Sequence, residues 1–294
     1  MTFLAALLLA VITPKIASPY LGLHVVDADN GRVLMSDKHD VECYPASCTK
    51  LMTLLLTLES VKRGEVSLSD MVKTTKLSSR ELPSISGIPY PGSIRLDELL
   101  KVLMVKSAND GAVMIAEHVA AARYKTATNS QQRLSCFIND MNTRARELGM
   151  KDTHFVTPNG YPPPKGSKRG FDRSTAQDMA ILGVELVKKT DVFKYTNITN
   201  LKVSDGDGKV YYYRTHNNLL RKDSEFYLEE ADGLKTGFHN AGGCSLVLTA
   251  KNKVGRRVVL AIMGCKTGKD RNATAQRVMR DALNMLDFGS SSLP

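Results

Sequence analysis

The sequence predicts an α+β fold in which both ends of the chain build one antiparallel sheet around a helical middle. Near the start, LHVVDADNGRVLMSD (23–37) has the pattern of two short strands joined at Asn30-Gly31. Near the end, CSLVLTA (244–250) and RRVVLAIMG (256–264) form a second such pair. Between the two pairs, apolar residues recur at helical spacing. We therefore expect one sheet completed by both ends of the chain, with a helical lobe inserted between its strands.

The turns support both strand pairs. Asn and Gly tolerate the positive φ that both central positions of a tight hairpin turn require, so Asn30-Gly31 favours an antiparallel hairpin. A polar turn containing Gly255 separates the second pair. Both pairs are therefore predicted to be antiparallel.

The helices follow from apolar residues that recur every three or four positions along one face. Three such segments lie in the middle of the chain: LDELLKVLMV (96–105), GAVMIAEHVAA (111–121) and TAQDMAILGVELV (175–187). A fourth helix, at about 272–287, is expected to pack back on the sheet. Loops are predicted where Ser, Pro, Gly and charged residues accumulate, at 76–93, 124–132 and 161–173.

The chain length bounds the domain organisation. With 294 residues, 43% of them hydrophobic, the chain can build one large core or two closely packed lobes. We predict one domain over about 19–290. Its sheet lobe is expected at about 19–75 and 200–290, and its helical lobe at about 76–199.

Residues 1–18 are predicted to be a signal or anchor segment. FLAALLLAVI (3–12) is about as long as the apolar core of a signal peptide and is too short to span a bilayer easily. We therefore expect export, to the periplasm or to the outer face of the cytoplasmic membrane. Peripheral contact with the membrane stays open.

The chain is basic, with 40 Lys and Arg against 30 Asp and Glu and a net charge of +10. Such a charge suits an anionic partner. However, the basic residues are scattered, Trp is absent, and there is no helix-turn-helix or aromatic RNA-binding signature, so we expect no nucleic acid partner. The five cysteines show no metal-ligand spacing, and His24, His118 and His216 are expected to be structural, so no metal is predicted.

PASCTKLMTLLL (45–56) places two nucleophile candidates, Ser47 and Cys48, just before Lys50 at the start of a predicted buried helix. On a helix, a residue three positions on lies about 60° around from its partner, and one two positions on about 160°. Lys50 is therefore expected beside Ser47 and away from Cys48, which should pack in the core. A lysine withdrawn from water has a lowered pKa, so its neutral amine can take a proton from the hydroxyl. The helix N-terminus adds N–H groups where an oxyanion would form.

A second motif lies between two predicted helices. KSANDGAVMIAEH (106–118) ends one helical pattern and opens the next. Its Ser107 and Asn109 are therefore candidates to point a hydroxyl and an amide into a cleft from the helical lobe.

A third motif lies on a predicted strand. DGLKTGF (232–238) places Lys235, Thr236 and Gly237 near the middle of that strand. A glycine inside a strand often marks a close approach of a ligand, so this strand is a candidate wall of the site.

The order of the three motifs, S-x-x-K, S-x-N and K-T-G, is similar to the signature of the penicilloyl-serine transferases. Longer segments match as well: YPASCTKLMT, KSANDGAVMIAE, LGMKDTHFVTPNG, STAQDMAILG and DGLKTGFHNAGGCSLV. Over about residues 20–288 the chain resembles the low-molecular-mass penicillin-binding proteins, specifically the D-alanyl-D-alanine carboxypeptidases. The resemblance implies a β-lactamase/transpeptidase-like fold, with an antiparallel five-stranded sheet flanked by helices and an inserted all-helical lobe. It also implies that no cofactor is needed.

The resemblance assigns catalytic roles to four residues. Ser47 is implied to be the acylated nucleophile, and Lys50 its proton acceptor. Ser107 would relay a proton, and Asn109 would hold the substrate amide.

The substrate-binding residues come from the third motif. Lys235 and Thr236 are implied to bind the terminal carboxylate of the peptide, with Gly237 beside them. A free carboxylate is held well by a cation and a hydroxyl, which supports this assignment independently. The backbone N–H groups of Ser47 and Phe238 would form the oxyanion hole.

Three departures from the family pattern are visible. Position 48 more often holds a larger apolar residue, and the loop 161–173 looks longer than usual. The sequence also ends at 294 without the second β-domain and amphipathic tail that many members carry, which leaves membrane attachment unassigned.

Other classes of function fit less well. A class A β-lactamase needs a deacylating glutamate, typically followed four residues later by Asn, and no glutamate between Ser107 and Lys235 has that neighbour. A non-catalytic penicillin-recognising module usually lacks a motif residue, whereas all are present here. A Cys-His hydrolase based on Cys48 has no recognisable His partner motif.

We therefore predict an exported serine DD-carboxypeptidase that removes the terminal D-alanine from peptidoglycan stem pentapeptides through an acyl-enzyme on Ser47. DD-endopeptidase action on cross-links is the close alternative. The expected partners are peptidoglycan stem peptides, with β-lactam antibiotics as covalent inhibitors.

Overall fold

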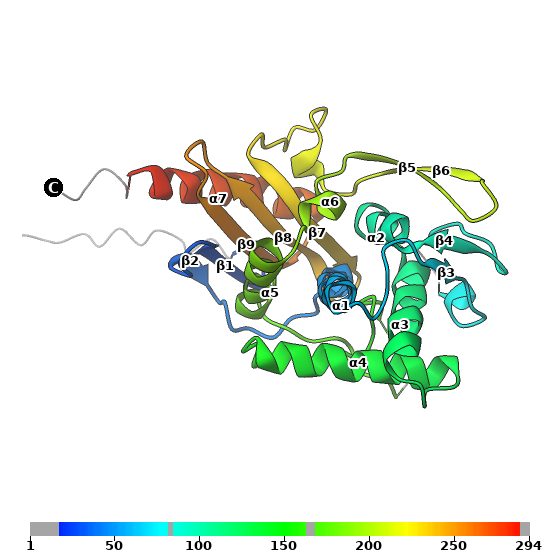
Figure 1. Cartoon of the computed structure of the whole chain (residues 1–294). Helices are drawn as coiled ribbons and strands as arrows, with labels where there is room; N and C mark the ends of the chain where they lie inside the picture. Colours follow the sequence, from blue (N-terminus) through cyan, green and yellow to red (C-terminus); the bar gives the residue numbers. More distant parts are fainter. Residues whose placement is uncertain (1–17, 82–84, 163–167, 289–294) are drawn as a thin grey trace, which may run out of the picture.

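The computed structural model describes residues 18–81, 85–162 and 168–288. Its main sheet has five antiparallel strands in the order β2-β1-β9-β8-β7 (Figure 1). These strands are β1 (Gly22–Asp27), β2 (Val33–Asp37), β7 (Ala231–His239), β8 (Gly243–Lys251) and β9 (Arg257–Cys265). The α+β prediction is confirmed, because the strands from the two ends of the chain meet where β1 pairs with β9.

The turn between β1 and β2 contains the predicted Asn30-Gly31 pair, although the connection runs from 28 to 32 rather than over two residues. Gly31 has a φ of +79°, and its N–H donates to the carbonyl of Asp27 at 2.8 Å. The Asn30 side chain accepts from the N–H of Arg32 at 2.9 Å. The two residues therefore shape the turn as their chemistry predicts.

Alternate residues along the strands face opposite layers of the molecule. On one side, α7 (Gly268–Phe288) covers the sheet, as predicted for the last helix, and buries side chains such as Leu260 and Ile262. On the other side, α5 (Ala176–Lys189) packs on β1, β8 and β9. The sheet is therefore the middle of three layers (Figure 1).

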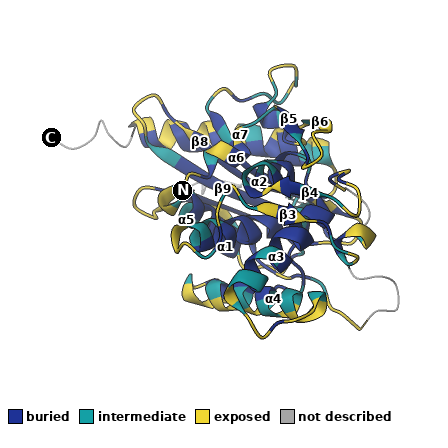
Figure 2. Ribbon diagram, turned by 45° about the vertical axis from the view of Figure 1, so that its right-hand side comes forward, coloured by how far each residue is buried: buried dark blue, intermediate teal, exposed yellow. Residues whose placement is uncertain are grey.

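The helical lobe surrounds one central helix, α1 (Lys50–Lys62), which carries buried residues all round its first two turns. Figure 2 shows α1 in dark blue, whereas the outer helix α4 has mostly intermediate and exposed residues. The other helices of the lobe are α2 (Leu96–Val105), α3 (Asn109–Arg123), α4 (Ser130–Glu147) and α6 (Phe193–Thr196). The predicted segments 96–105 and 111–121 fall within helices, and 175–187 does so except for Thr175, which is the N-cap residue of α5.

Helix α4 shows where a predicted loop was too long, because the loop at 124–132 ends at Asn129. The Asn129 side chain accepts a hydrogen bond from the N–H of Gln132 at 3.0 Å and so caps the helix. Asn and Ser residues read as a loop because they favour turns, but the same side chains also favour helix N-caps.

Two small hairpins were not predicted. They are formed by β3 (Met71–Lys73) with β4 (Ser93–Arg95), and by β5 (Asn200–Ser204) with β6 (Val210–Arg214). Because β4 lies within 76–199, that lobe is not wholly helical, which corrects the prediction. Strands of three residues show too little alternation to be recognised from the sequence.

Three short 3₁₀ turns complete the described elements: η1 (Ala46–Thr49), η2 (Ser78–Arg80) and η3 (Asn218–Leu220). The predicted signal or anchor segment lies outside the described residues, apart from Ser18. In the described part of the chain, every helix is too short or too polar to cross a bilayer.

Candidate active site

The candidate nucleophile lies in a 3₁₀ turn. The sequence placed Ser47 in the first turn of an α-helix, but η1 comes first and α1 begins at Lys50. In a 3₁₀ turn, side chains three positions apart eclipse each other, which brings Ser47 and Lys50 into line. The Nζ of Lys50 lies 2.9 Å from the Oγ of Ser47, so the predicted contact is present.

Lys50 is completely buried and has two further partners. Its Nζ donates to Oδ1 of Asn109 at 2.8 Å and to the carbonyl oxygen of Asn159 at 2.7 Å. Burial, and then the charge of Lys235, hold the pKa of Lys50 well below its usual value. The site therefore favours the neutral amine.

The loop that carries Asn159 is held by Asp172, a fully buried carboxylate. Asp172 accepts from the backbone N–H groups of Val156 and Thr157 and from the hydroxyls of Thr157 and Thr49. Because Thr49 lies between Ser47 and Lys50 in the chain, this carboxylate ties the loop to the nucleophile turn.

Two glycines allow the walls of the site to approach closely. A Cβ on Gly160 would lie 1.8 Å from the carbonyl oxygen of Ala46, and Gly160 also has a φ of +77°. A Cβ on Gly237 would lie 2.6 Å from the carbonyl oxygen of Pro45. The glycine in strand β7 thus admits the nucleophile turn, where the sequence suggested a ligand.

Strained backbone occurs at two positions of the site. Ala46 has a φ of +48° and Ser107 a φ of +62°, a region that residues other than glycine rarely adopt. Such strain persists where the surroundings enforce it, and it is common at functional sites. Ser107, which lies between α2 and α3 and is only 8% exposed, is one of the residues that line the cavity.

The β7 wall carries Lys235, Thr236, Gly237 and Phe238, the predicted substrate-binding residues. Lys235 is nearly inaccessible, and its Nζ donates to the backbone oxygen of Thr236 at 3.0 Å. Burial lowers its pKa to about 8. Phe238 is 61% exposed at the mouth of the site.

These residues enclose a cavity of about 390 Å³. It is lined by Ser47, Ser107, Asn109, Gly160, Tyr161, His216, Thr236, Gly237, Phe238 and Arg271. The three motifs begin at Ser47, Ser107 and Lys235, which are 60 and 128 residues apart, and they meet around one hollow in the described part of the molecule.

Four residues that line the cavity were not predicted from the sequence: Gly160, Tyr161, His216 and Arg271. The last two have basic side chains. Arg271, on α7, is 7% exposed, and His216 was expected to be structural. Burial lowers the pKa of both side chains. Neither residue belongs to a recognisable local motif, and both reach the site through the tertiary fold. His24 and His118, by contrast, make structural contacts with Ser36 and Asp70.

Cys48 lies in the core, as predicted from the helix geometry. Its side chain is fully buried, and its Sγ donates to the carbonyl oxygen of Lys235 at 3.4 Å. Burial raises the pKa of the Cys48 thiol to about 11. A thiol in this state is a poor nucleophile, because the reactive species is the thiolate.

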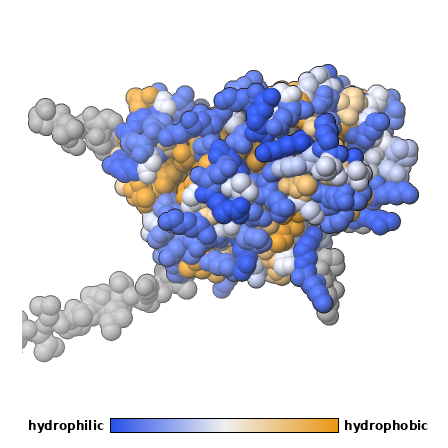
Figure 3. All heavy atoms as spheres, turned by 60° about the horizontal axis from the view of Figure 1, so that its bottom comes forward, coloured by the Kyte–Doolittle hydropathy of each residue, from blue (hydrophilic) through white to orange (hydrophobic). Residues whose placement is uncertain are grey.

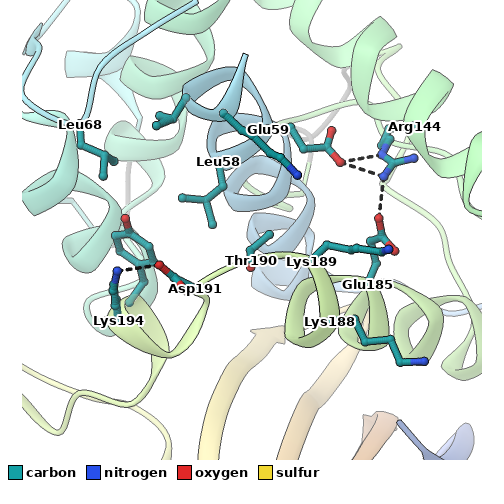
Figure 4. A pocket seen from close by; sticks show the side chains of 13 residues that line it. Leu58, Glu59, Leu68, Arg144, Glu185, Lys188, Lys189, Thr190, Asp191 and Lys194 are labelled. Atoms are coloured by element: carbon teal, nitrogen blue, oxygen red, sulfur yellow. Dashed lines mark hydrogen bonds and ion pairs between the residues drawn. The ribbon is translucent and has the colours of Figure 1, made fainter. Parts of the chain in front are cut away.

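A larger hollow, of about 610 Å³, lies at the other end of α1 (Figure 4). There Arg144 pairs with Glu59 and Glu185 at 2.8 and 2.7 Å, and Lys194 pairs with Asp191 at 2.6 Å. Figure 3 shows the face of the molecule that lies at the bottom of Figure 1, and most of this face is hydrophilic. This larger hollow contains none of the predicted site residues. Among all the described residues, no group of three or more His, Cys, Asp or Glu side chains could hold a metal ion.

Comparisons with known proteins identify the family of this chain. A sequence profile of the D-alanyl-D-alanine carboxypeptidase family matches residues 22–267. The chain is 30% identical over 280 residues to the D-alanyl-D-alanine carboxypeptidase DacF of Bacillus subtilis, which covers 95% of this chain and 64% of DacF. It is 28% identical over 232 residues to a D-alanyl-D-alanine endopeptidase of Haemophilus influenzae, which covers 78% of this chain and 70% of that protein.

Among solved structures, the chain is similar to Penicillin-Binding Protein D2 of Listeria monocytogenes in its ampicillin-bound form. The TM-score is 0.73 at 25% identity, over 91% of this chain and 98% of that one. The chain spans less than two thirds of the length of DacF.

Proposed function

Because the chain belongs to the D-alanyl-D-alanine carboxypeptidase family, we propose that it is a serine DD-carboxypeptidase acting through an acyl-enzyme on Ser47. The observation that carries the proposal is the environment of Lys50. A neutral amine has two N–H groups and one lone pair. The oxygens of Asn109 and Asn159 accept the two N–H groups, which directs the lone pair at the Ser47 hydroxyl.

Acylation follows from this arrangement. Lys50 takes the proton of Ser47 while Oγ attacks the carbonyl carbon between the last two residues of the peptide. The N–H groups of Ser47 and Phe238 would stabilise the oxyanion. The C–N bond then breaks, and the proton passes from Lys50 through Ser107 to the leaving nitrogen. The products are D-alanine and a peptidyl ester on Ser47.

One end of the cavity, called here the cation end, is formed by Arg271 and Thr236 with Lys235 close by. Its positive charge suits the terminal carboxylate of the peptide. Thr236 and Arg271 stand on the wall and would bind this carboxylate directly. Lys235 lies behind them, where its charge adds to the field and lowers the pKa of Lys50. Asn109 turns its oxygen to Lys50, so its amide N–H groups are the ones to donate to a substrate carbonyl.

Deacylation uses the same groups in reverse roles. Once Lys50 has passed on its proton, the neutral amine can take a proton from water, which attacks the ester carbon. The C–O bond to Ser47 then breaks, Oγ takes the proton back from Lys50, and the shortened peptide leaves as an acid that loses its proton to solvent.

The substrate class sets the location and the inhibitors. Stem peptides of peptidoglycan lie outside the cytoplasmic membrane, so we place the activity there, with residues 1–18 as the export signal or anchor. β-Lactams share a strained amide and a carboxylate with the substrate, and the Listeria relative was solved with ampicillin bound. We therefore propose that they acylate Ser47.

The test is mass spectrometry of a stem pentapeptide incubated with the purified protein. We expect loss of one D-alanine, giving the tetrapeptide. A matched pentapeptide ending in D-alaninamide lacks the charge that the cation end recognises, and it should react roughly 10–100-fold more slowly. Equal turnover of acid and amide would remove the carboxylate assignment, and intact pentapeptide would overturn the proposed function.

A further inference from the structure

The hairpin β5–β6 presents an unusual outer face. Lys202 and Tyr212 lie directly opposite each other in its register, and Asn200 lies opposite Arg214. Tyr212 is 73% exposed, with the Lys202 Nζ 5.9 Å from the centre of its ring. An aromatic ring beside a cation, held on a strand pair, can bind an acidic peptide or sugar chain.

The inner face of the same hairpin fixes it to the molecule. The Tyr213 hydroxyl donates to the carbonyl oxygen of Ser86 at 2.6 Å, and the Tyr211 and Tyr213 rings pack against the main core. Within the hairpin, the Tyr211 hydroxyl donates to Asp205 at 2.8 Å. The two inner rings stack at 6.3 Å. Because side chains alternate along a strand, anchoring Tyr211 and Tyr213 inward holds Tyr212 outward.

The hairpin is close in the chain to a residue of the catalytic cavity. Strand β6 ends at Arg214, and His216, two residues on, lines the cavity. Four extended residues span at most about 14 Å, so the backbone at Tyr212 lies within that distance of His216. A stem pentapeptide, about 17 Å long when extended, could reach from one to the other.

His216 also identifies which end of the cavity the hairpin adjoins. Burial lowers its pKa first, and the charges of Lys235, Lys106 and Arg271 lower it further. These cations mark the end proposed to hold the carboxylate of the leaving D-alanine. A free D-alanine ends there, and nothing of it extends beyond.

A surface beyond the carboxylate end has a use only when the leaving group is larger than D-alanine. In a peptidoglycan cross-link, the leaving nitrogen belongs to a second stem peptide, which bears free carboxylates. Lys202 has no carboxylate partner among the described residues, and it provides the complementary charge.

We propose that the outer face of β5–β6, centred on Tyr212 and Lys202, binds the second stem peptide of a cross-link and so directs the site to endopeptidase cleavage as well. The proposal rests on the proposed function. The amide between D-alanine and the amine of the second strand breaks, Ser47 takes the acyl group, and the amine leaves with the proton relayed from Ser47. Water then releases the ester.

The experiment compares two soluble substrates, a stem pentapeptide and a cross-linked peptide dimer. Tyr212→Ala should lower kcat/KM for the dimer about fivefold and leave the pentapeptide value within about twofold. Lys202→Glu should act in the same direction, because it places a negative charge against the carboxylates. The matched controls are Val254→Ala, also 73% exposed but on the β8–β9 turn, and Lys253→Glu beside it, and both should leave the dimer value unchanged.

The outcomes separate the two proposals. A wild-type protein that hydrolyses the pentapeptide but not the dimer overturns the second-strand surface and leaves the carboxypeptidase proposal standing. Equal losses on both substrates, or no loss on the dimer, also overturn it. Failure to hydrolyse either substrate contradicts the proposed function itself.

Discussion

The two ends of helix α1 carry two hollows that differ in how their charges are arranged. At the N-terminal end, Lys50 and Lys235 are buried, and no carboxylate lies within ion-pair distance of either among the described residues. At the C-terminal end, about 18 Å along the axis, Arg144 is shared between Glu59 and Glu185. The N-terminal hollow is the smaller, at about 390 against 610 Å³.

This difference shows that size is a poor guide to the reactive end. Paired, partly exposed charges contribute little beyond local stability. Buried cations with no ion-pair partner cost folding free energy, and they persist where a function requires a shifted pKa or an anionic ligand. The predictions below test whether the chemistry is confined to the N-terminal end.

The largest effect is expected at Ser47. Labelled penicillin should attach stoichiometrically to the wild-type protein and leave slowly, because the leaving nitrogen stays tethered and obstructs water. Ser47→Ala should abolish labelling, whereas Cys48→Ala should preserve it, since that thiol is buried with a raised pKa. Gel fluorography and peptide mapping measure both. Labelling that survives Ser47→Ala and is lost in Cys48→Ala would refute the helix geometry.

The next effect concerns Lys50. Lys50→Arg keeps the positive charge but removes a base that can lose its proton at accessible pH. Acylation by labelled penicillin should slow by at least about a hundredfold. Stopped-flow or quenched labelling gives the rate, with Lys62→Arg at the other end of α1 as the matched control. Near-normal acylation in Lys50→Arg would exclude Lys50 as the base.

A smaller effect is expected from pH. Lys50 must be neutral, so kcat/KM for the pentapeptide should fall as the pH drops through its lowered pKa. Lys235 must be charged, so kcat/KM should also fall as the pH rises above about 8. In Lys235→Arg the guanidinium stays charged, so the alkaline fall should move to higher pH. An unchanged alkaline limb would assign that titration to another group.

The smallest effect is expected at the C-terminal end of α1. Arg144→Ala removes partly exposed ion pairs, which should cost about 1 kcal/mol and lower Tm by about 2 °C. The rates of penicillin labelling and of D-alanine release should stay within twofold of wild type. A loss of activity larger than the loss of stability would show that the two ends of α1 are coupled.

Local features of the site could be predicted from the sequence. Ser47 and Lys50 are three positions apart, and this spacing brings side chains together in both an α-helix and a 3₁₀ turn. The predicted contact is therefore present even though the turn is 3₁₀. The strand that carries Thr236 was also recognisable, because its pattern lies within nine residues. Periodicity over short distances carries this information.

Features that depend on distant contacts were not predictable. The carbonyl oxygen of Asn159 faces Lys50 because Asp172 holds its loop, and no sequence pattern connects these positions. Arg271 reaches the cavity from the helix that covers the sheet. Helix α4 was not predicted as an element, and one reason is that its polar residues outnumber its apolar ones. Such features depend on packing rather than on local propensity.

The pairing of β1 with β9 has a consequence for how the protein is made. Leu23 lies opposite Ile262, so the sheet joins residues 239 positions apart in the chain. Closing so long a loop makes folding slow, and although β1 can pair early with β2, it can pair with β9 only after the ribosome has released residues up to Cys265. Ser47 and Lys50 are synthesised well before β7 and α7, which complete the cavity. The growing polypeptide therefore carries its proposed nucleophile without a formed cavity until residues of α7 have been made.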